Sequence, residues 1–186
     1  MSKAKSDLEK KVEEGLYGRP EIKKEEKNRF LGQFEERVIR YLTYKQVIEP
    51  GTYPEILNAI GHQVAEKLII DREVELSYAR DYIELARENK LDFQRIDSPE
   101  FKGDVALVVV SGQRVDVKKR KVLNRKERLQ NLGISDNIIN NVGAKLCNKC
   151  RLTLAKNAPE ELINYNKINW WERLVGVRCI CQQEES

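Results

Sequence analysis

The four cysteines of this 186-residue chain fall as two tight pairs near its C-terminal end, Cys147-Asn-Lys-Cys150 and Cys179-Ile-Cys181. Sulfur atoms two or three residues apart can point at one position in space, and two such pairs supply the four thiolates of a tetrahedral structural zinc site. We therefore predict one structural Zn²⁺ ion bound by all four cysteines. The set contains no histidine or carboxylate and leaves no open coordination position, which argues against catalytic zinc.

Three other uses of the same thiols remain open from the sequence. They can be reduced, partly buried thiols without a metal, a redox dithiol, or the ligands of an iron–sulfur centre, which the spacing alone admits. A thioredoxin-type dithiol is disfavoured, because Cys147 follows an apparently helical run rather than a strand.

The chain carries no sign of export or of membrane insertion. No apolar stretch follows its basic N-terminus, so we expect no secretory signal and a cytoplasmic location, where thiols stay reduced. No apolar run approaches the roughly 20 residues that a membrane span needs, so we expect no membrane partner.

Apolar patterns ahead of the cysteines predict an α/β fold. The predicted helices cover 29–45, where Phe30, Phe34, Val38 and Leu42 recur every four residues, a stretch from about residue 52 with a Thr52–Glu55 capping box, and 75–89. The predicted strands cover 46–49, 68–70, 91–96 and 105–110. Because helices alternate with strands, we expect a mixed or parallel sheet with helices packed on it.

Charge and residue pattern divide the chain into three parts: an N-terminal helix and linker over 1–28, an α/β core over 29–117, and an extension over 118–186. Residues 1–117 hold 20 Lys/Arg and 23 Asp/Glu, a net charge of −3, whereas residues 118–186 hold 14 and 7, a net charge of +7. In the first part, Leu8, Val12 and Leu16 lie four residues apart and predict a short helix.

The extension begins with a strongly basic run, which we interpret as a basic amphipathic helix ended by Gly133. Its cationic residues are Lys118, Lys119, Arg120, Lys121, Arg125, Lys126 and Arg128. Clustered Lys and Arg residues are typical of contact with a phosphate backbone, although a charged solvated helix face has the same composition. RNA or a ribonucleoprotein is therefore the first partner to consider.

Trp170 and Trp171 lie between the two cysteine pairs, next to Leu174 and Val175. Tryptophan can stack on bases or anchor a protein interface. Two Trp residues beside Leu and Val are more often a small hydrophobic core, here one packed near the metal site.

No catalytic constellation is visible in the sequence. The single histidine, His62, has no Ser or Cys partner nearby in the sequence and fits a structural role. Asp71 and Asp97 follow predicted strands, at the edge where open α/β sheets bind ligands, although ordinary turn-forming aspartates occupy the same places. The glycines form no phosphate loop or dinucleotide fingerprint. We therefore expect a protein that is not an enzyme.

Several motifs resemble the YueI family, uncharacterised proteins of low-GC Gram-positive bacteria. The resemblance covers about residues 6–120 and is carried by Leu16-Tyr-Gly18, Arg29-Phe-Leu-Gly32, Glu36-Arg-Val38, and the region from Leu68-Ile-Ile-Asp71 to Asp104-Val-Ala-Leu107. It implies a fold like that of the Bacillus-type chorismate mutase, a mixed sheet with packed helices. The C-terminal segment with the four cysteines lies outside the region of resemblance.

The implied fold is similar to that of ribosomal and kink-turn-binding proteins, which grip RNA with a Gly-x-Asn-Glu type motif at the start of the second helix. The equivalent stretch here is Pro50-Gly-Thr-Tyr-Pro-Glu55, which keeps the Gly and the Glu but lacks the Asn and the following Lys. The sequence thus favours a bacterial RNA- or ribonucleoprotein-binding protein with a structural zinc site. The alternatives are a protein–protein adaptor that uses the two tryptophans, and a small-molecule-binding protein or enzyme that uses the strand ends.

Overall fold

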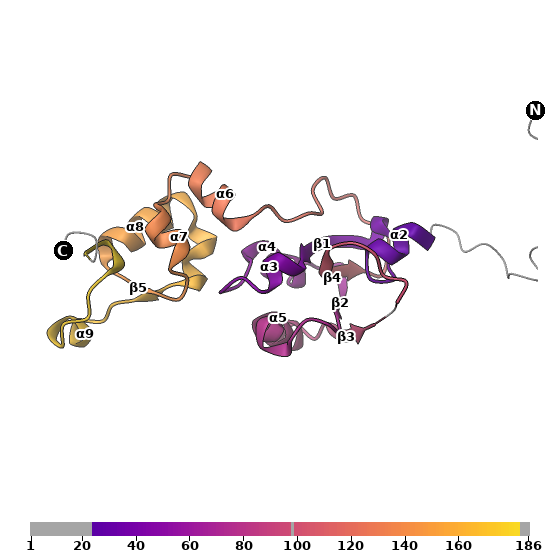
Figure 1. Ribbon diagram of the computed structural model, residues 1–186, viewed down its shortest axis with the longest axis horizontal. Coiled ribbons are helices and arrows are strands. Elements are labelled where there is room, and N and C mark those ends of the chain that lie inside the picture. Colours follow the sequence, from indigo (N-terminus) through magenta and orange to yellow (C-terminus); the bar gives the residue numbers. More distant parts are fainter. Residues whose placement is uncertain (1–23, 98, 183–186) are drawn as a thin grey trace, which may run out of the picture.

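The computed structural model of the protein describes residues 24–97 and 99–182. They form two lobes joined by the chain between β4 and α6 (Figure 1). The predicted helix at Leu8 to Leu16 lies outside the described residues. No helix among them is long and apolar enough to cross a bilayer.

The first lobe, here called the core, consists of a four-stranded sheet and its helices. In chain order its elements are α2 (Lys24–Arg29), the 3-10 turn η1 (Glu35–Arg37), β1 (Val38–Thr43), α3 (Tyr44–Val47), α4 (Pro54–Ile60), β2 (Ala65–Asp71), α5 (Leu76–Glu88), β3 (Asp92–Ile96) and β4 (Val105–Ser111). The strand order is β1-β4-β2-β3, and only β2 and β3 run parallel. The predicted mixed sheet with packed helices is therefore confirmed, as are the strands at 68–70, 91–96 and 105–110 and the helix at 75–89.

The sheet is covered on both faces. Leu68 and Ile70 of β2 pack with α4 and α5 in one apolar cluster, whereas Ile69 faces a second cluster that contains Phe30 and Leu31. All seven residues of β4 are buried, as expected for a continuous apolar run between two packed faces.

The predicted helix over 29–45 is wrong. Leu31 and Gly32 both have positive φ, 51° and 79°, which ends α2, and the chain then enters the sheet as β1. The fourfold repeat of apolar residues also fits a strand buried on both faces, and pairing with β4 decides between the two structures.

The predicted strand at 46–49 is also wrong, because the chain forms α3 there. The Gln46 side chain accepts a hydrogen bond from the Thr43 N–H at 3.0 Å and donates to the Val122 carbonyl at 2.9 Å. The Thr52–Glu55 capping box does not form either, since α4 begins at Pro54 with Tyr53 as its N-cap. The Thr52 N–H and the Glu55 carboxylate instead bind Asn164 and Arg128 of the second lobe.

The second lobe, here called the C-terminal lobe, has its own small core. Its elements are α6 (Arg125–Asn131), α7 (Asp136–Asn140), β5 (Lys145–Leu146), α8 (Asn148–Asn157), η2 (Pro159–Asn164), β6 (Asn166–Lys167), α9 (Trp170–Leu174) and η3 (Ile180–Gln182). Leu129, Ile138, Leu154 and Tyr165 pack there with the buried Cys150 and Cys179. Val122 still belongs to the apolar cluster of the first lobe, whereas Leu129 belongs to that of the C-terminal lobe. Along the chain, the change from one hydrophobic cluster to the other therefore lies between these two residues. The predicted domain boundary at 117 stays a prediction.

The basic helix predicted from residue 118 is wrong over its first half. Helix α6 starts only at Arg125, and the chain before it runs beside β1, where the Tyr41 N–H donates to the Arg120 carbonyl at 3.1 Å. A bridge between Tyr41 and Lys121 continues this pairing. The backbone partner on β1 therefore outweighs the helical pattern of the side chains.

A buried polar cluster joins the two lobes. Arg125 and Glu161, 3% and 0% exposed, form an ion pair with 3.6 Å between Nε and Oε2, and the Arg125 guanidinium also donates to the Thr52 carbonyl at 2.6 Å. Asn164 accepts from the Thr52 N–H and donates to the Thr52 carbonyl, both at 2.8 Å. Arg128 binds Glu161 and Glu55. The lobes are thus held together mainly by hydrogen-bonded polar groups.

Gly51 lies at this junction with φ +78°, and a Cβ there would come 2.5 Å from Val142 Cγ1 and 2.7 Å from Asn164 Oδ1. We expect Gly51→Ala to lower the free energy of unfolding by about 2–5 kcal/mol, from the left-handed backbone and the overpacking together. Gly133→Ala is the matched control, since Gly133 has φ +72° and open space around it, so only the backbone cost of about 1–2 kcal/mol should appear. Urea unfolding of the two variants measures the difference, and equal losses would contradict the tight approach.

Candidate metal centre and exposed binding surfaces

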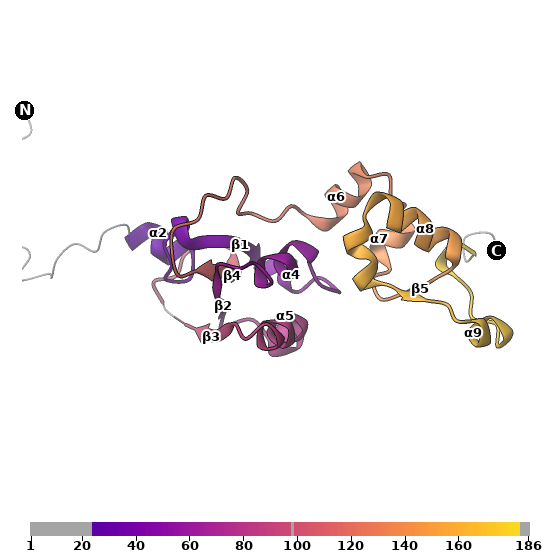
Figure 2. The same cartoon turned by 180° about the vertical axis from the view of Figure 1, so that it is seen from behind.

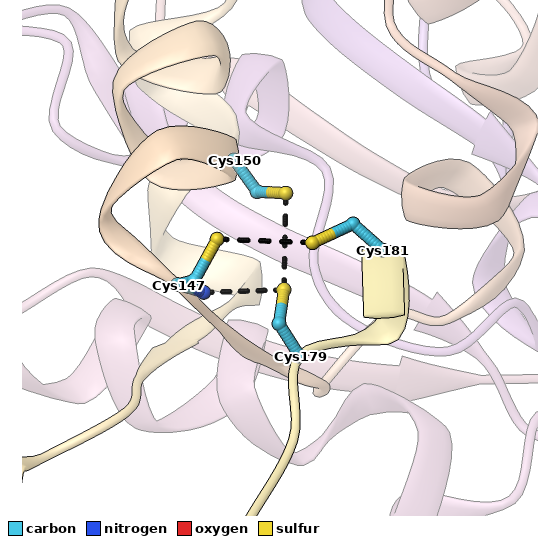
Figure 3. A group of neighbouring side chains, drawn as sticks. All are labelled: Cys147, Cys150, Cys179 and Cys181. Atoms are coloured by element: carbon cyan, nitrogen blue, oxygen red, sulfur yellow. Dashed lines mark hydrogen bonds between the residues drawn. The ribbon is translucent and has the colours of Figure 1, made fainter. Parts of the chain in front are cut away.

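The four cysteines come together in the C-terminal lobe (Figure 3). Cys147 is the N-cap residue of α8 and Cys150 lies in its first turn, whereas Cys179 and Cys181 lie at η3. The four sulfur atoms lie within 4.8 Å of one another. The fold thus unites two pairs that are 28 residues apart in the sequence.

Two of the sulfur–sulfur distances match those around a four-coordinate metal ion. Metal–sulfur bonds of about 2.3 Å in a tetrahedron give sulfur–sulfur edges of about 3.8 Å. The Cys147–Cys181 and Cys150–Cys179 sulfur pairs are 3.8 and 3.7 Å apart. These distances are far longer than a disulfide bond of about 2.0 Å, and all four cysteines are free. The arrangement could therefore hold one metal ion.

The surrounding groups favour thiolate at part of this cluster. The Cys147 N–H donates to Cys179 Sγ at 3.2 Å, an orienting bond of the kind that supports metal ligands. Burial opposes ionisation of Cys147, but hydrogen bonds from the Cys150 backbone and the neighbouring thiols outweigh it and lower the pKa of Cys147 to about 7. Burial raises the pKa of Cys150 and of Cys181. Among the described residues, no histidine or carboxylate joins the four sulfurs.

Three of the seven basic residues proposed for nucleic-acid contact are engaged inside the protein. Arg120 donates to backbone carbonyls of residues 35, 115 and 117, while Arg125 and Arg128 form the junction between the lobes. The four lysines, at positions 118, 119, 121 and 126, are exposed. The structure therefore leaves a smaller basic surface than the sequence indicates.

The stretch that corresponds to the RNA-gripping motif is covered. Thr52 is bound by Asn164, Glu55 by Arg128, and the Pro50 carbonyl accepts from Arg125 at 2.5 Å. All three partners belong to the C-terminal lobe, so this stretch of the chain is used to dock that lobe.

The two tryptophans do not form a buried core near the cysteines, contrary to the interpretation that their composition favours. Trp170, Trp171, Leu174 and Val175, here called the Trp patch, are 62%, 64%, 69% and 78% exposed. The two indole rings lie 3.8 Å apart between centroids. Helix α9 is short and projects from its lobe (Figures 1 and 2), so its apolar side chains find no surface to cover.

The predicted ligand residues Asp71 and Asp97 line the same cavity of about 140 Å³, beyond the carboxyl ends of the parallel strands β2 and β3. Asp71 is buried and accepts a hydrogen bond from the Glu73 N–H at 2.9 Å. Such a hydrogen bond is common for an aspartate in a turn. The ligand role of Asp71 and Asp97 stays a prediction. His62 is exposed just after α4, accepts a hydrogen bond from the Val64 N–H at 3.4 Å, and is not part of the cysteine cluster.

Sequence reasoning missed the polar cluster between the lobes and a cleft of about 440 Å³ beside it. Both are made by residues more than 70 positions apart, such as Thr52 and Asn164. The only signal in the sequence was the pair of acidic residues after Pro159, which looked like an ordinary turn.

Known proteins match the core of this chain, and the match to the family model ends before the first cysteine. A family model described as "Protein of unknown function (DUF1694)" matches residues 5–121. The "Uncharacterized protein YueI" of Bacillus subtilis (strain 168) is 29% identical over 111 residues, 60% of this chain and 83% of that protein. The crystal structure of the YueI protein from Bacillus subtilis matches with a TM-score of 0.53 at 24% identity, over 63% of this chain and 91% of that chain. The fold of the core is thus that of a solved relative.

Proposed function

Because this chain belongs to the DUF1694 family of proteins of unknown function, whose match ends at residue 121, we propose that the C-terminal lobe is an added binding module. In this proposal a structural zinc ion folds the lobe, and the lobe presents the Trp patch to a protein partner. The observation that carries the proposal is the exposure of four large apolar side chains, three on one short helix and one at its C-cap.

The composition of the Trp patch favours a protein partner. Aromatic residues are enriched at the centres of protein interfaces, and tryptophan is among the most frequent residues whose truncation costs much binding energy. Leu174 and Val175 add aliphatic surface that stacking on nucleic-acid bases does not require. Large apolar side chains exposed together in this way often mark a protein interaction site.

Zinc is the ion that best suits the cysteine cluster. A closed set of four thiolates is the usual ligand set of a structural zinc site, and it leaves no position for a substrate. The ion would tie the start of α8 to η3, since each contributes two sulfurs.

The metal site and the Trp patch are mechanically linked. On one side of α9, Ile168 is buried and its N–H donates to the Leu146 carbonyl at 3.1 Å. On the other side the chain reaches Cys179 within five residues of α9. The N-terminal end of the projecting segment is therefore fixed by the buried Ile168, and its C-terminal end by the metal ion bound to Cys179. Loss of the ion should leave the Trp patch without a fixed position.

A photoreactive amino acid tests the patch directly. We expect p-benzoylphenylalanine in place of Trp171 to give discrete crosslinks to protein in living cells, because its ring would lie in the interface. Leu152 on α8 is the matched control position, being 69% exposed but outside the patch, and should give none. Equal crosslinking at the two positions, or crosslinks from position 171 to nucleic acid alone, would contradict the proposal.

RNA binding is a second candidate, supported by the four exposed lysines at positions 118, 119, 121 and 126. None of them takes part in an ion pair with another described residue. They lie on the strand-like segment before α6 and in its first turn, where a phosphate backbone can approach.

Charge reversal tests this second candidate. If these lysines contact phosphates, a Lys118→Glu/Lys119→Glu variant should weaken RNA binding and reduce the slope of log affinity against log salt by about 0.7 for each phosphate that is no longer neutralised. Lys45→Glu, which reverses an exposed lysine of the core, is the control. An unchanged slope, measured by fluorescence anisotropy with single-stranded RNA, would rule out this surface.

A further inference from the structure

The cleft between the lobes is lined by both apolar and acidic side chains. Its volume is about 440 Å³, and Leu57, Leu85, Val142 and Ile163 supply its apolar lining. Ile163 is 64% exposed, so this part of the apolar lining is open to solvent. A concave site of this size accommodates one or two large side chains.

The acidic lining comes from a single helix. Asp81, Glu84 and Glu88 of α5 all line the cleft, at the spacing that places side chains on one helix face. All three are exposed, and none forms an ion pair with another described residue. Three neighbouring carboxylates without cationic partners raise the local negative potential, which favours a cationic partner.

The Trp patch is the counterpart of this cleft in shape and charge. It is apolar and lies on a projecting helix (Figure 1), which carries the exposed Arg173 and has the exposed Lys167 and Arg178 on either side of it in the sequence. The one acid of α9, Glu172, is paired with Lys145. The projecting helix therefore combines large apolar side chains with unbalanced positive charge.

We propose that the Trp patch of one copy of this chain docks into the acidic cleft of a second copy. This inference rests on the proposed function, for which it names the partner. The indole rings would cover the leucine, valine and isoleucine side chains of the cleft, and the flanking arginines would face Asp81, Glu84 and Glu88. Complementary charge across an interface mainly sets orientation and partner choice, while the buried apolar contacts supply affinity.

The arrangement is intermolecular. Helices α9 and α5 are well separated along the long axis of the molecule in both views (Figures 1 and 2), so one chain cannot place its own patch in its own cleft as folded. Where only one patch docks into one cleft, each copy still offers a free patch or a free cleft. Such head-to-tail contacts build rings or chains, whereas reciprocal docking of both patches across a two-fold axis gives a closed dimer.

Complementation between two variants tests this geometry. The patch variant is Trp171→Ser and the cleft variant is Glu84→Lys/Glu88→Lys, both with zinc content and circular dichroism checked against the wild type. By sedimentation velocity, the mean mass of the wild-type species should rise with protein concentration. Each variant alone should associate at least about tenfold more weakly than the wild type. An equimolar mixture should form a one-to-one dimer that does not grow, since it contains one intact patch facing one intact cleft. Leu152→Ser and Asp92→Lys, which change exposed residues elsewhere, should behave as the wild type.

The outcomes separate this inference from the proposed function. A wild type that stays monomeric, or a cleft variant that still assembles, overturns docking of a second copy. If position 171 then still crosslinks to a different protein, the adaptor function stands with another partner. If position 171 crosslinks to peptide 81–88 of a second chain, the docking is supported, and if it crosslinks to nothing, both proposals fail.

Discussion

Replacement of Cys179 by serine is expected to release the metal ion and unfold most of the C-terminal lobe. Cys179 is fully buried, and its sulfur lies beside that of Cys150 and accepts the Cys147 N–H. A structural zinc ion supplies about 10–16 kcal/mol of apparent binding energy, which is as large as the whole stability of a typical domain. Metal analysis and hydrogen exchange should show loss of the ion and of amide protection in α7 and α8, whereas β2 and β4 keep theirs.

Two substitutions at the exposed Cys181 separate metal binding from packing. Cys181→His retains a nitrogen ligand for zinc, so it should keep most of the ion and of the protection. Cys181→Ser lacks a good ligand and should lose both, although serine is closer to cysteine in size than histidine is. If Cys181→Ser retains full protection, or if Cys179→Ser binds the ion as tightly as the wild type, the four cysteines are not the metal site that folds the lobe.

Glu161→Ala should be the most damaging substitution outside the metal site. It leaves the buried guanidinium of Arg125 without its carboxylate and removes an acceptor of Arg128 and Asn164. Removing one partner of a buried ion pair costs about 3–5 kcal/mol, because the remaining charge stays desolvated. Urea unfolding measures the loss, and hydrogen exchange at the Thr52 amide reports whether the lobes separate.

Glu160→Ala is the matched control for this prediction. Glu160 binds the same Arg128 through an oxygen 2.9 Å from Nη1, but its side chain is 39% exposed. A solvated pair of this kind contributes less than about 1 kcal/mol. Similar losses for Glu160→Ala and Glu161→Ala would mean that burial at the junction does not have the effect inferred here.

The sequence predicted those features whose cause is local. The run from Val105 to Val110 is apolar enough to require burial on both faces, and it forms β4. The stripe of α5 and the two cysteine pairs are equally local, because short spacing itself fixes where the side chains point. These features define the sheet and the candidate metal centre.

The errors arose where a distant partner decides the outcome. Phe30 to Leu42 has an apolar repeat that fits a helix, but pairing with β4 makes its second half a strand. Arg125 looks like a solvent-facing cation in the sequence, yet the carbonyls of Pro50 and Thr52 bind it. A contact between residues more than 70 positions apart leaves no mark on local periodicity, so the interface between the lobes could only be seen in the fold.

The central claim is that one zinc ion bound by four cysteines folds the lobe that carries the Trp patch. Native mass spectrometry of freshly purified protein, before and after treatment with a chelator, tests it most directly. We expect one zinc ion per chain, which the chelator removes together with the compact charge-state distribution of the folded lobe. A chain that carries no metal under conditions that preserve other zinc proteins, or iron in its place, would contradict the claim.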